Sequence, residues 1–243
     1  MDSVKLNREL PRVTLVTIDG NGKDTTKLLE VIDICTRKIN FGSVILITAD
    51  PDIESNDKVT IHRIQKMTYP EYNTFCITDL NEYVNTEFCL IAQTDGFICK
   101  PTNWMDEFYN YDYIGAPWMD AEPGYFPWVT EPKYQVGCGG FCFRSKKLLQ
   151  AGADINKGYI TRMTEAGMGE DVIICVSLRN YFEKMDCKFP TGEFAKKFAL
   201  GSAPLKENQL ETTFGFHSNE YMPEVRKMIE RWDDYETTRN INK

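Results

Sequence analysis

An aspartate and a glycine follow a short apolar segment in the first half of the chain. Phe88–Ala92 has the composition of a buried β-strand, and Asp95 and Gly96 come shortly after it. A carboxylate at the end of a buried strand can hold a divalent cation, which would bridge phosphate oxygens and stabilise a departing diphosphate. Gly96 would allow close backbone approach or a positive φ. Alternatively, Asp95 is a turn residue whose carboxylate accepts hydrogen bonds from backbone N–H groups.

A second acidic turn, residues 19–25, follows another apolar run, Val13–Ile18. Its sequence, DGNGKDT, invites comparison with a phosphate-binding loop, which needs an earlier glycine and a final Ser or Thr beside the lysine. Here Thr17 stands in place of that glycine, and Asp24 replaces the hydroxyl. The turn also lacks the dinucleotide pattern GxGxxG. Asp19 could instead accept a hydrogen bond from a ribose hydroxyl or base N–H, or it could simply stabilise the turn.

The segments that must position these residues alternate between strand-like and helix-like patterns in the first half. Such alternation is typical of βαβ units and a mostly parallel sheet. The predicted strands are Val13–Ile18, Ser43–Thr48, Lys58–Arg63 and Phe88–Ala92. The predicted helices run from an N-cap at Asp24 to about Ile39 and from Glu71 to Tyr83.

The second half is more irregular. A short helix is predicted at Trp104–Tyr109, a glycine-interrupted strand at Val136–Phe143, and a helix capped by Ser145 after it. Helical spacing continues over Asp171–Lys184, and a charged amphipathic helix is predicted at about Pro223–Tyr235.

Composition and charge limit the classes of function. The 243 residues are 42% hydrophobic and 26% charged, as in an ordinary globular protein, and the net charge of −8 argues against a broad nucleic-acid-binding surface. No apolar run is long enough to span a bilayer and residues 1–10 do not resemble a signal peptide, so we expect a cytoplasmic protein. The eight cysteines are therefore expected to be reduced core residues rather than zinc ligands or disulfides.

Five segments occur in an order that is known from one family. They are Gln93-Thr-Asp-Gly96, Tyr111-Asp-Tyr-Ile-Gly-Ala-Pro-Trp118, Val136-Gly-Cys-Gly-Gly-Phe-Cys-Phe-Arg-Ser145, Gly169-Glu-Asp-Val172 and Phe214-Gly-Phe-His217. Together they resemble a family from bacteria and viruses that is regarded as glycosyltransferases, with QxDG, YDYIGAPW, GxGGF, ED and GFH motifs. The resemblance covers about Arg12 to His217, and its architecture is similar to the GT-A glycosyltransferase fold.

The resemblance implies an α/β, GT-A-like single domain over residues 1–243, with a mostly parallel central sheet flanked by helices. A nucleotide-binding half would span about 10–100, an irregular acceptor-binding and catalytic half about 101–220, and a C-terminal helix 221–243. The implied function is transfer of a sugar from a nucleotide-sugar donor, with a UDP-sugar favoured, to a hydroxyl acceptor.

Metal ligands are implied at Asp95, which matches the last acid of a D-x-D motif, and at His217, which matches a late histidine of several GT-A families. Gln93 occupies the earlier acidic position, so this chain departs from the motif. A carboxylate, an imidazole and a diphosphate would suit Mn²⁺ or Mg²⁺, with Mn²⁺ more tolerant of nitrogen.

Catalytic residues are implied at the acidic pair Glu170 and Asp171. Asp171 would take the proton of the acceptor hydroxyl and Glu170 would orient acceptor hydroxyls, although the two roles could be exchanged. The alternative is that both acids stabilise a helix N-terminus through capping and the helix dipole.

Donor or acceptor contacts are also expected from the glycine-rich segment and the aromatic loop. Gly139 and Gly140 remove side chains where a sugar could approach the backbone, and Arg144 could pair with a phosphate or a buried acid. The aromatic residues are suited to stacking on a sugar or base, or to packing in the core; they are Trp118, Tyr125, Phe126 and Trp128.

Two other functions remain open from the sequence. One is a phosphotransferase that uses Gly20–Thr25 as a phosphate loop, and the other is a catalytically silent sugar- or nucleotide-binding module, which Gln93 favours. The acceptor could be a glycan, a small molecule or a modified DNA base, and no oligomeric state is indicated.

Overall fold

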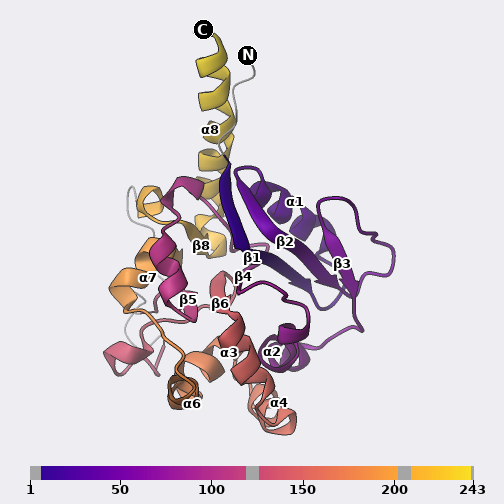
Figure 1. Cartoon of the computed structure of the whole chain (residues 1–243), viewed down its shortest axis with the longest axis vertical. Coiled ribbons are helices and arrows are strands. Elements are labelled where there is room, and N and C mark those ends of the chain that lie inside the picture. The colour runs from indigo at the N-terminus through magenta and orange to yellow at the C-terminus, as the bar shows by residue number, and fades with distance from the viewer. Residues whose placement is uncertain (1–6, 119–125, 202–208, 242–243) are drawn as a thin grey trace.

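The computed structural model describes residues 7–118, 126–201 and 209–241, with side chains described up to residue 232. In these ranges the chain forms a mixed α/β structure around a six-stranded sheet with the order β3-β2-β1-β4-β6-β5 (Figure 1). The strands are β1 (Arg8–Asp19), β2 (Ile39–Thr48), β3 (Thr60–Arg63), β4 (Phe88–Ala92), β5 (Tyr113–Gly115) and β6 (Cys142–Ser145). The predicted α/β class, with a mostly parallel central sheet flanked by helices, is confirmed.

β1 to β4 form the parallel part of the sheet, with β1 between β2 and β4. The second half of β1 and all of β4 are buried, which explains why both are apolar without polar alternation. β6 runs antiparallel to β4 and β5, so its first residue, Cys142, lies opposite Ile91. The segment that leads into β6 therefore lies beside the carboxyl end of β4.

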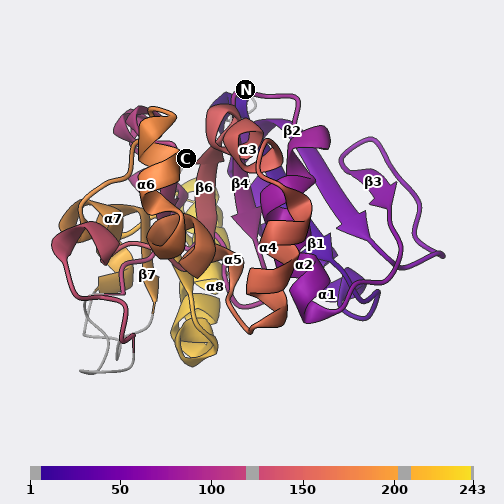
Figure 2. The same cartoon turned by 90° about the horizontal axis from the view of Figure 1, so that it is seen from below.

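Helices cover the sheet in two groups. α1 (Thr25–Thr36) packs along β1 and β2. α2 (Tyr69–Thr78), α3 (Lys146–Ala153) and α4 (Lys157–Glu165) lie together at the lower end of Figure 1 and nearest the viewer in Figure 2. Ser145 caps α3 as predicted, because its hydroxyl accepts a hydrogen bond from Leu148 N at 3.1 Å.

Several predicted boundaries are wrong. α1 ends at Thr36, and Ile39 is the first residue of β2, where it pairs with Arg8. The helix predicted from Glu71 starts at Tyr69, because Thr68 and Glu71 form a reciprocal capping box, and it ends at Thr78 before a 3-10 turn. The short helix predicted at Trp104–Tyr109 is a 3-10 helix over Asp106–Asn110.

The glycine-rich segment is not the strand predicted at Val136–Phe143. Only Cys142–Ser145 is a strand. Cys138 has a φ of 59°, which breaks the extended backbone. A Cβ on Gly137 would stand 1.8 Å from Trp118 Cζ2, so the backbone here passes directly over an indole ring.

The rest of the second half is mostly helical. The predicted helix Asp171–Lys184 consists of α5 (Glu170–Val172), a π-helical stretch at Ile173–Ser177 and α6 (Arg179–Lys184). α7 (Gly192–Phe198) precedes β7 (Ala199–Gly201), which pairs in parallel with β8 (Gly215–His217). The final helix, α8 (Met222–Ile241), extends away from the sheet at the top of Figure 1.

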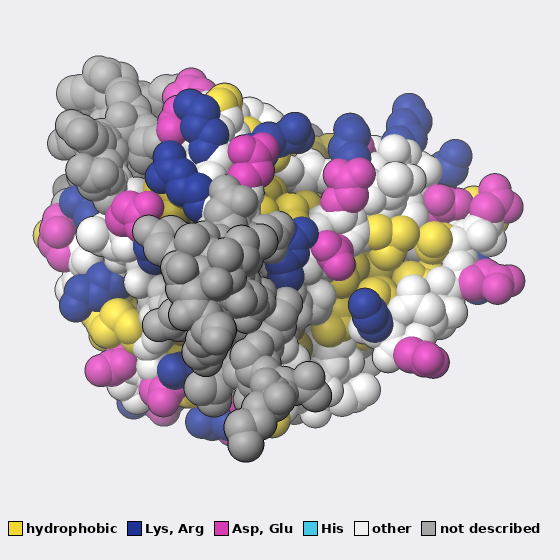
Figure 3. All heavy atoms as spheres, turned by 90° about the horizontal axis from the view of Figure 1, so that it is seen from above, with side chains coloured by type: hydrophobic (Ala, Val, Ile, Leu, Met, Phe, Trp, Pro, Cys, Tyr) yellow, Lys and Arg dark blue, Asp and Glu magenta, His cyan; other side chains and the backbone are white. Residues whose placement is uncertain are grey.

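Surface and core features agree with the composition. All eight cysteines are buried core residues, as predicted. Basic and acidic side chains are interspersed on the face shown in Figure 3, without a continuous basic area among the described residues. Within the described ranges, no helix is both long enough and apolar enough to span a bilayer.

Candidate functional site

The candidate site lies beyond the carboxyl ends of β1 and β4, where open α/β sheets bind ligands. After β4 the chain makes a tight turn in which Gln93 N donates to Gly96 O at 2.8 Å and Gly96 N donates to Gln93 O at 3.1 Å. The following residues run beside β8, since Phe216 N donates to Phe97 O and Ser218 N donates to Asp95 O. This pairing brings the end of β8 to Asp95.

Asp95 and His217 face each other at this edge. Asp95 Oδ1 lies 3.6 Å from His217 Nε2, and the two side chains are 24% and 26% exposed. Asp95 Oδ2 accepts a hydrogen bond from Asn219 Nδ2 at 3.0 Å. Among the described residues, no backbone N–H of the turn donates to the Asp95 carboxylate, so the interpretation of Asp95 as a turn-stabilising residue lacks its hydrogen bonds.

Gly140 lets the preceding segment of β6 lie against this pair. A Cβ on Gly140 would stand 2.0 Å from His217 Nε2 and 2.7 Å from Gln93 Oε1. Gly96 is required for the same reason, since its Cβ would stand 2.8 Å from His217 Cδ2. Close approach, rather than a positive φ, therefore explains both glycines.

Gly139 connects this group to the acidic pair. Its N–H donates to Asp171 Oδ2 at 3.2 Å, and a Cβ at this position would stand 1.6 Å from Glu170 Oε1. The Gly139–Gly140 backbone thus contacts His217 and Gln93 at Gly140 and both acids at Gly139. Asp171 is partly exposed, and its Oδ1 also accepts a hydrogen bond from Val172 N at 2.8 Å. Asp171 therefore supports the first turn of α5 and faces the site as well.

Glu170 and Arg144 form a buried ion pair. Arg144 Nη2 lies 2.7 Å from Glu170 Oε2, and the side chains are 0% and 7% exposed. Burial raises the pKa of Glu170 to about 7, while the charge of Arg144 acts in the opposite direction. The remaining donors of the Arg144 guanidinium bond Cys76 O and Cys142 Sγ, and this burial disfavours its direct contact with a donor substrate. Of the two partners proposed for it, the buried acid is the one it has.

Asp19 uses its carboxylate within its own turn. Oδ1 accepts hydrogen bonds from Gly22 N and Lys23 N, and Oδ2 accepts them from Asp24 N and the Thr25 hydroxyl, at 2.7–3.2 Å. This geometry favours the turn interpretation over a contact with ribose or base. It also disfavours a phosphate loop, because the backbone amides that would wrap phosphates already bond to Asp19.

The aromatic loop is not an open stacking surface. Trp118 is 2% exposed and packs against Phe126 and Trp128 with ring centroids 5.5 and 5.6 Å apart. This burial favours the packing alternative for Trp118, which lies against Gly137, over stacking on a ligand. Trp128 is partly buried, and its indole Nε1 has no hydrogen-bond partner among the described residues. Tyr125 lies outside the described residues.

A divalent cation would have few charged ligands here. The described residues contain no group of three His, Cys, Asp or Glu side chains arranged to hold a metal. Asp95 and His217 fit as a pair, since their 3.6 Å separation is slightly wider than the roughly 3 Å between neighbouring ligands of an octahedral ion. Other ligands would have to come from a bound diphosphate, water or uncharged side chains.

Comparison with known sequences identifies the family. Residues 58–217 match a family described as "Protein of unknown function (DUF5672)". The chain belongs to the DUF5672 family. No curated protein matches the chain. The DUF5672 range contains Asp95, Gly139, Gly140 and Asp171 and ends at His217, whereas Asp19 lies before it.

In this DUF5672 protein, α2 supplies residues that the sequence patterns did not indicate. Asn73 Oδ1 accepts a hydrogen bond from Glu170 N at 2.8 Å, and Tyr72 accepts one from Gln93 Nε2 at 2.8 Å. Tyr69 is 67% exposed, and its hydroxyl lies near Gly169. The one available signal was an asparagine among apolar positions of a helix, because a buried amide needs partners.

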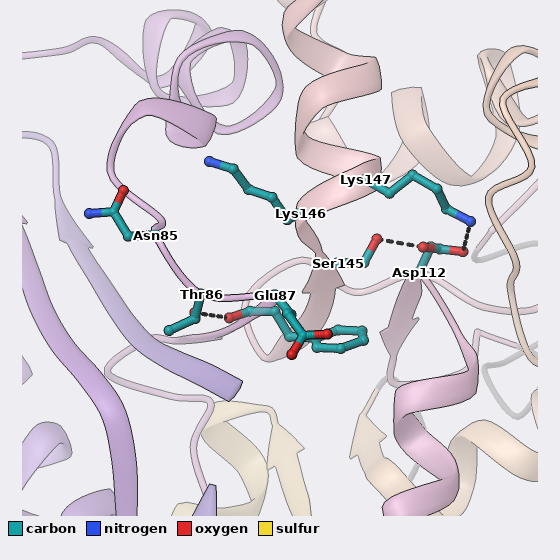
Figure 4. Close-up of a pocket in the computed structure, with 8 residues that line it drawn as sticks. Asn85, Thr86, Glu87, Asp112, Ser145, Lys146 and Lys147 are labelled. Atoms are coloured by element: carbon teal, nitrogen blue, oxygen red, sulfur yellow. Dashed lines mark hydrogen bonds and ion pairs between the residues drawn. The ribbon is translucent and has the colours of Figure 1, made fainter. Parts of the chain in front are cut away.

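A depression of about 390 Å³ lies at the opposite end of β4 (Figure 4). Its two lysines are already bound: Lys146 donates to Asn81 O and Val84 O at 2.6 Å, and Lys147 lies 3.1 Å from Asp112. Ser145 also bonds Asp112 there. Because both lysines are paired, neither offers an uncompensated positive charge to an anionic ligand in this depression.

Proposed function

We propose that this DUF5672 protein is a GT-A-like glycosyltransferase that moves a sugar from a nucleotide-sugar donor, with a UDP-sugar favoured, to a hydroxyl acceptor. The observation that supports it best is the convergence of Asp95, His217 and Asp171 around Gly139–Gly140 at the carboxyl edge of the sheet. A glycosyl transfer needs a cation-binding group for the leaving diphosphate and a carboxylate for the acceptor, and the two lie against adjacent glycines of one backbone segment.

On the donor side, Asp95 and His217 would hold a divalent cation, Mn²⁺ or Mg²⁺. The cation would supply electrostatic stabilisation of the negative charge that develops on the departing diphosphate. Both side chains are about one-quarter exposed, so a ligand can reach them without rearrangement of the core.

On the acceptor side, Asp171 would take the proton from the acceptor hydroxyl. The acceptor oxygen then bonds to the anomeric carbon of the donor sugar, and the bond from that carbon to the diphosphate oxygen breaks. Asp171 suits this role better than Glu170, which is 5% exposed and paired with Arg144. Glu170 would instead position the Gly169–Asp171 turn through its backbone bond to Asn73.

Donor turnover and binding test the proposal. We expect UDP- or GDP-sugars with Mn²⁺ to raise the melting temperature of the protein or to be hydrolysed. Asp95→Ala should abolish both effects while changing the free energy of unfolding by less than about 1 kcal/mol, because its carboxylate makes only one described hydrogen bond.

Asp57→Ala is the matched control, since Asp57 is an exposed aspartate in the loop before β3. It should leave binding and turnover unchanged. An absence of stabilisation and turnover with every nucleotide sugar would contradict the proposal. Saturable donor binding without turnover, over a broad panel of acceptors, would indicate a catalytically silent binding module instead.

A further inference from the structure

Gln93 occupies the first position of the turn that carries Asp95, and its amide has a fixed orientation. Gln93 Nε2 donates to the Tyr72 hydroxyl oxygen at 2.8 Å. Tyr72 is partly buried and also forms a side-chain hydrogen bond with Cys76. The Tyr72 oxygen is the acceptor of this bond, so the Gln93 N–H group faces it.

The amide oxygen of Gln93 consequently faces the candidate site. Gln93 Oε1 and His217 Nε2 both lie close to the point where a Cβ of Gly140 would stand, at 2.7 and 2.0 Å. Asp95 Oδ1 lies 3.6 Å from the same His217 nitrogen. Gln93 Oε1 and Asp95 Oδ1 thus both lie near His217 Nε2, beside a position that a glycine keeps free of a side chain.

We propose that Gln93 Oε1 is a third protein ligand, together with Asp95 Oδ1 and His217 Nε2, for a divalent cation. The inference builds on the cation site of the proposed function. Amide oxygens are ordinary ligands of hard divalent cations, and the imidazole favours Mn²⁺ over Mg²⁺. Gln93 would then replace the missing acid as a ligand without replacing its charge.

The charge of this set has a consequence for the order of binding. One carboxylate, one amide and one neutral imidazole leave a divalent cation with net positive charge. An anionic diphosphate would remove that excess, so cation and diphosphate should each strengthen the binding of the other. The site would hold Mn²⁺ weakly alone and more tightly together with the diphosphate.

Calorimetric titration of the full chain with Mn²⁺, with and without inorganic pyrophosphate, tests this assignment. Gln93→Met keeps the length of the side chain but removes the oxygen, and we expect a loss of about tenfold or more in Mn²⁺ affinity. Gln93→Glu adds a charge at the same place, and its carboxylate can accept a hydrogen bond from the Tyr72 hydroxyl. It should tighten Mn²⁺ binding while reducing the gain from pyrophosphate. Tyr72→Phe should weaken Mn²⁺ binding because the amide loses its orienting partner.

Gln135→Met is the matched control, since Gln135 is a partly exposed glutamine in the loop before Val136. It should bind Mn²⁺ like the wild type. An unchanged Mn²⁺ affinity in Gln93→Met, or a weaker one in Gln93→Glu, would overturn the assignment. Circular dichroism and melting temperatures of the variants separate a lost ligand from a lost fold.

Asp95→Asn separates a failure of this inference from a failure of the proposed function. If Asp95→Asn abolishes Mn²⁺ binding and Gln93→Met does not, only the role of Gln93 is wrong. If the wild type binds no Mn²⁺ even with pyrophosphate, the cation site is wrong. Sugar transfer that proceeds in EDTA would then leave the glycosyltransferase proposal intact.

Discussion

Arg144 and Glu170 form a buried ion pair, in which each charge needs the other as a partner. Arg144 is 0% exposed, and its guanidinium bonds Glu170, Cys76 O and Cys142 Sγ. The Arg144 guanidinium carbon Cζ also lies 5.3 Å from the centroid of the Tyr113 ring. Glu170 in turn lies against the bare Cα of Gly139. The ion pair therefore holds the acidic turn against the glycine segment, which makes Arg144 a positioning residue for the candidate site.

Arg144→Met should destabilise the protein strongly. Removal of one partner of a buried ion pair leaves the other charge without compensation, and we expect a loss of about 3–5 kcal/mol in the free energy of unfolding above neutral pH. Urea unfolding measures this loss. Lys227→Ala is the control, because Lys227 and Glu224 form an exposed pair with side chains 58% and 53% exposed. The control should change stability by less than about 1 kcal/mol, and equal effects of the two substitutions would contradict the structural role of Arg144.

At the scale of elements, the loop between β1 and α1 is organised by Asp19. Four donors of the loop converge on its carboxylate, which is buried at the end of β1. Asp24 occupies the N-cap position of α1 but makes no side-chain capping bond, and it pairs with Lys27 instead. The start of α1 is thus stabilised by Asp19, the last residue of β1, rather than by an N-cap side chain.

Asp19→Ala distinguishes the two interpretations of this residue. If Asp19 organises the loop, its loss leaves one buried and three partly buried donors without this acceptor and should cost about 2–4 kcal/mol of unfolding free energy. Asn21→Ala removes one exposed loop bond, to Lys23 N, and should cost less than about 1 kcal/mol. A stable Asp19→Ala protein with a raised KM for the nucleotide sugar would instead assign Asp19 to the donor.

Sequence patterns predicted the elements whose burial is uniform, and they failed where tertiary contacts decide the backbone. The strand at Phe88–Ala92 was predicted with its observed bounds, because a short apolar run between turns has few alternatives. The glycine segment before β6 was predicted as strand. Its backbone conformation depends on contacts with Trp118, His217 and Glu170, which are distant in the sequence. The local pattern of apolar residues does not indicate these contacts.

Part of the candidate site was also predictable from the sequence, and part was not. Ordered motifs indicated Asp95, Asp171 and His217 as one group, and the structure brings them together at the carboxyl edge of the sheet. The support from α2 was not predictable, since Tyr72 and Asn73 reach Gln93 and Glu170 across long separations in sequence. Which acid is buried and which is partly exposed also depends on packing rather than on residue type.

At the scale of the whole molecule, the acidic turn makes global stability depend on pH. The pKa of Glu170 rises from 4.5 to about 7 on folding, because burial disfavours its charged form. Between these values the folded protein retains a proton that the unfolded chain has lost. This contribution is fully present below about pH 4.5, falls as the pH rises through about 7, and is constant above that.

Urea unfolding of wild type and Glu170→Gln from about pH 5 to about pH 8 measures this contribution of Glu170 to the unfolding free energy. Glutamine does not titrate, and every other group is shared, so the difference in unfolding free energy reports Glu170 alone. The exposed carboxylates Glu71 and Glu87 have lowered pKa values and act in the opposite direction, but below pH 4.5. We expect the wild type to lose stability relative to the variant up to about pH 7 and then to run parallel to it. A difference that stays constant over the whole range would mean that Glu170 is charged in the folded protein throughout, held so by Arg144 despite its burial.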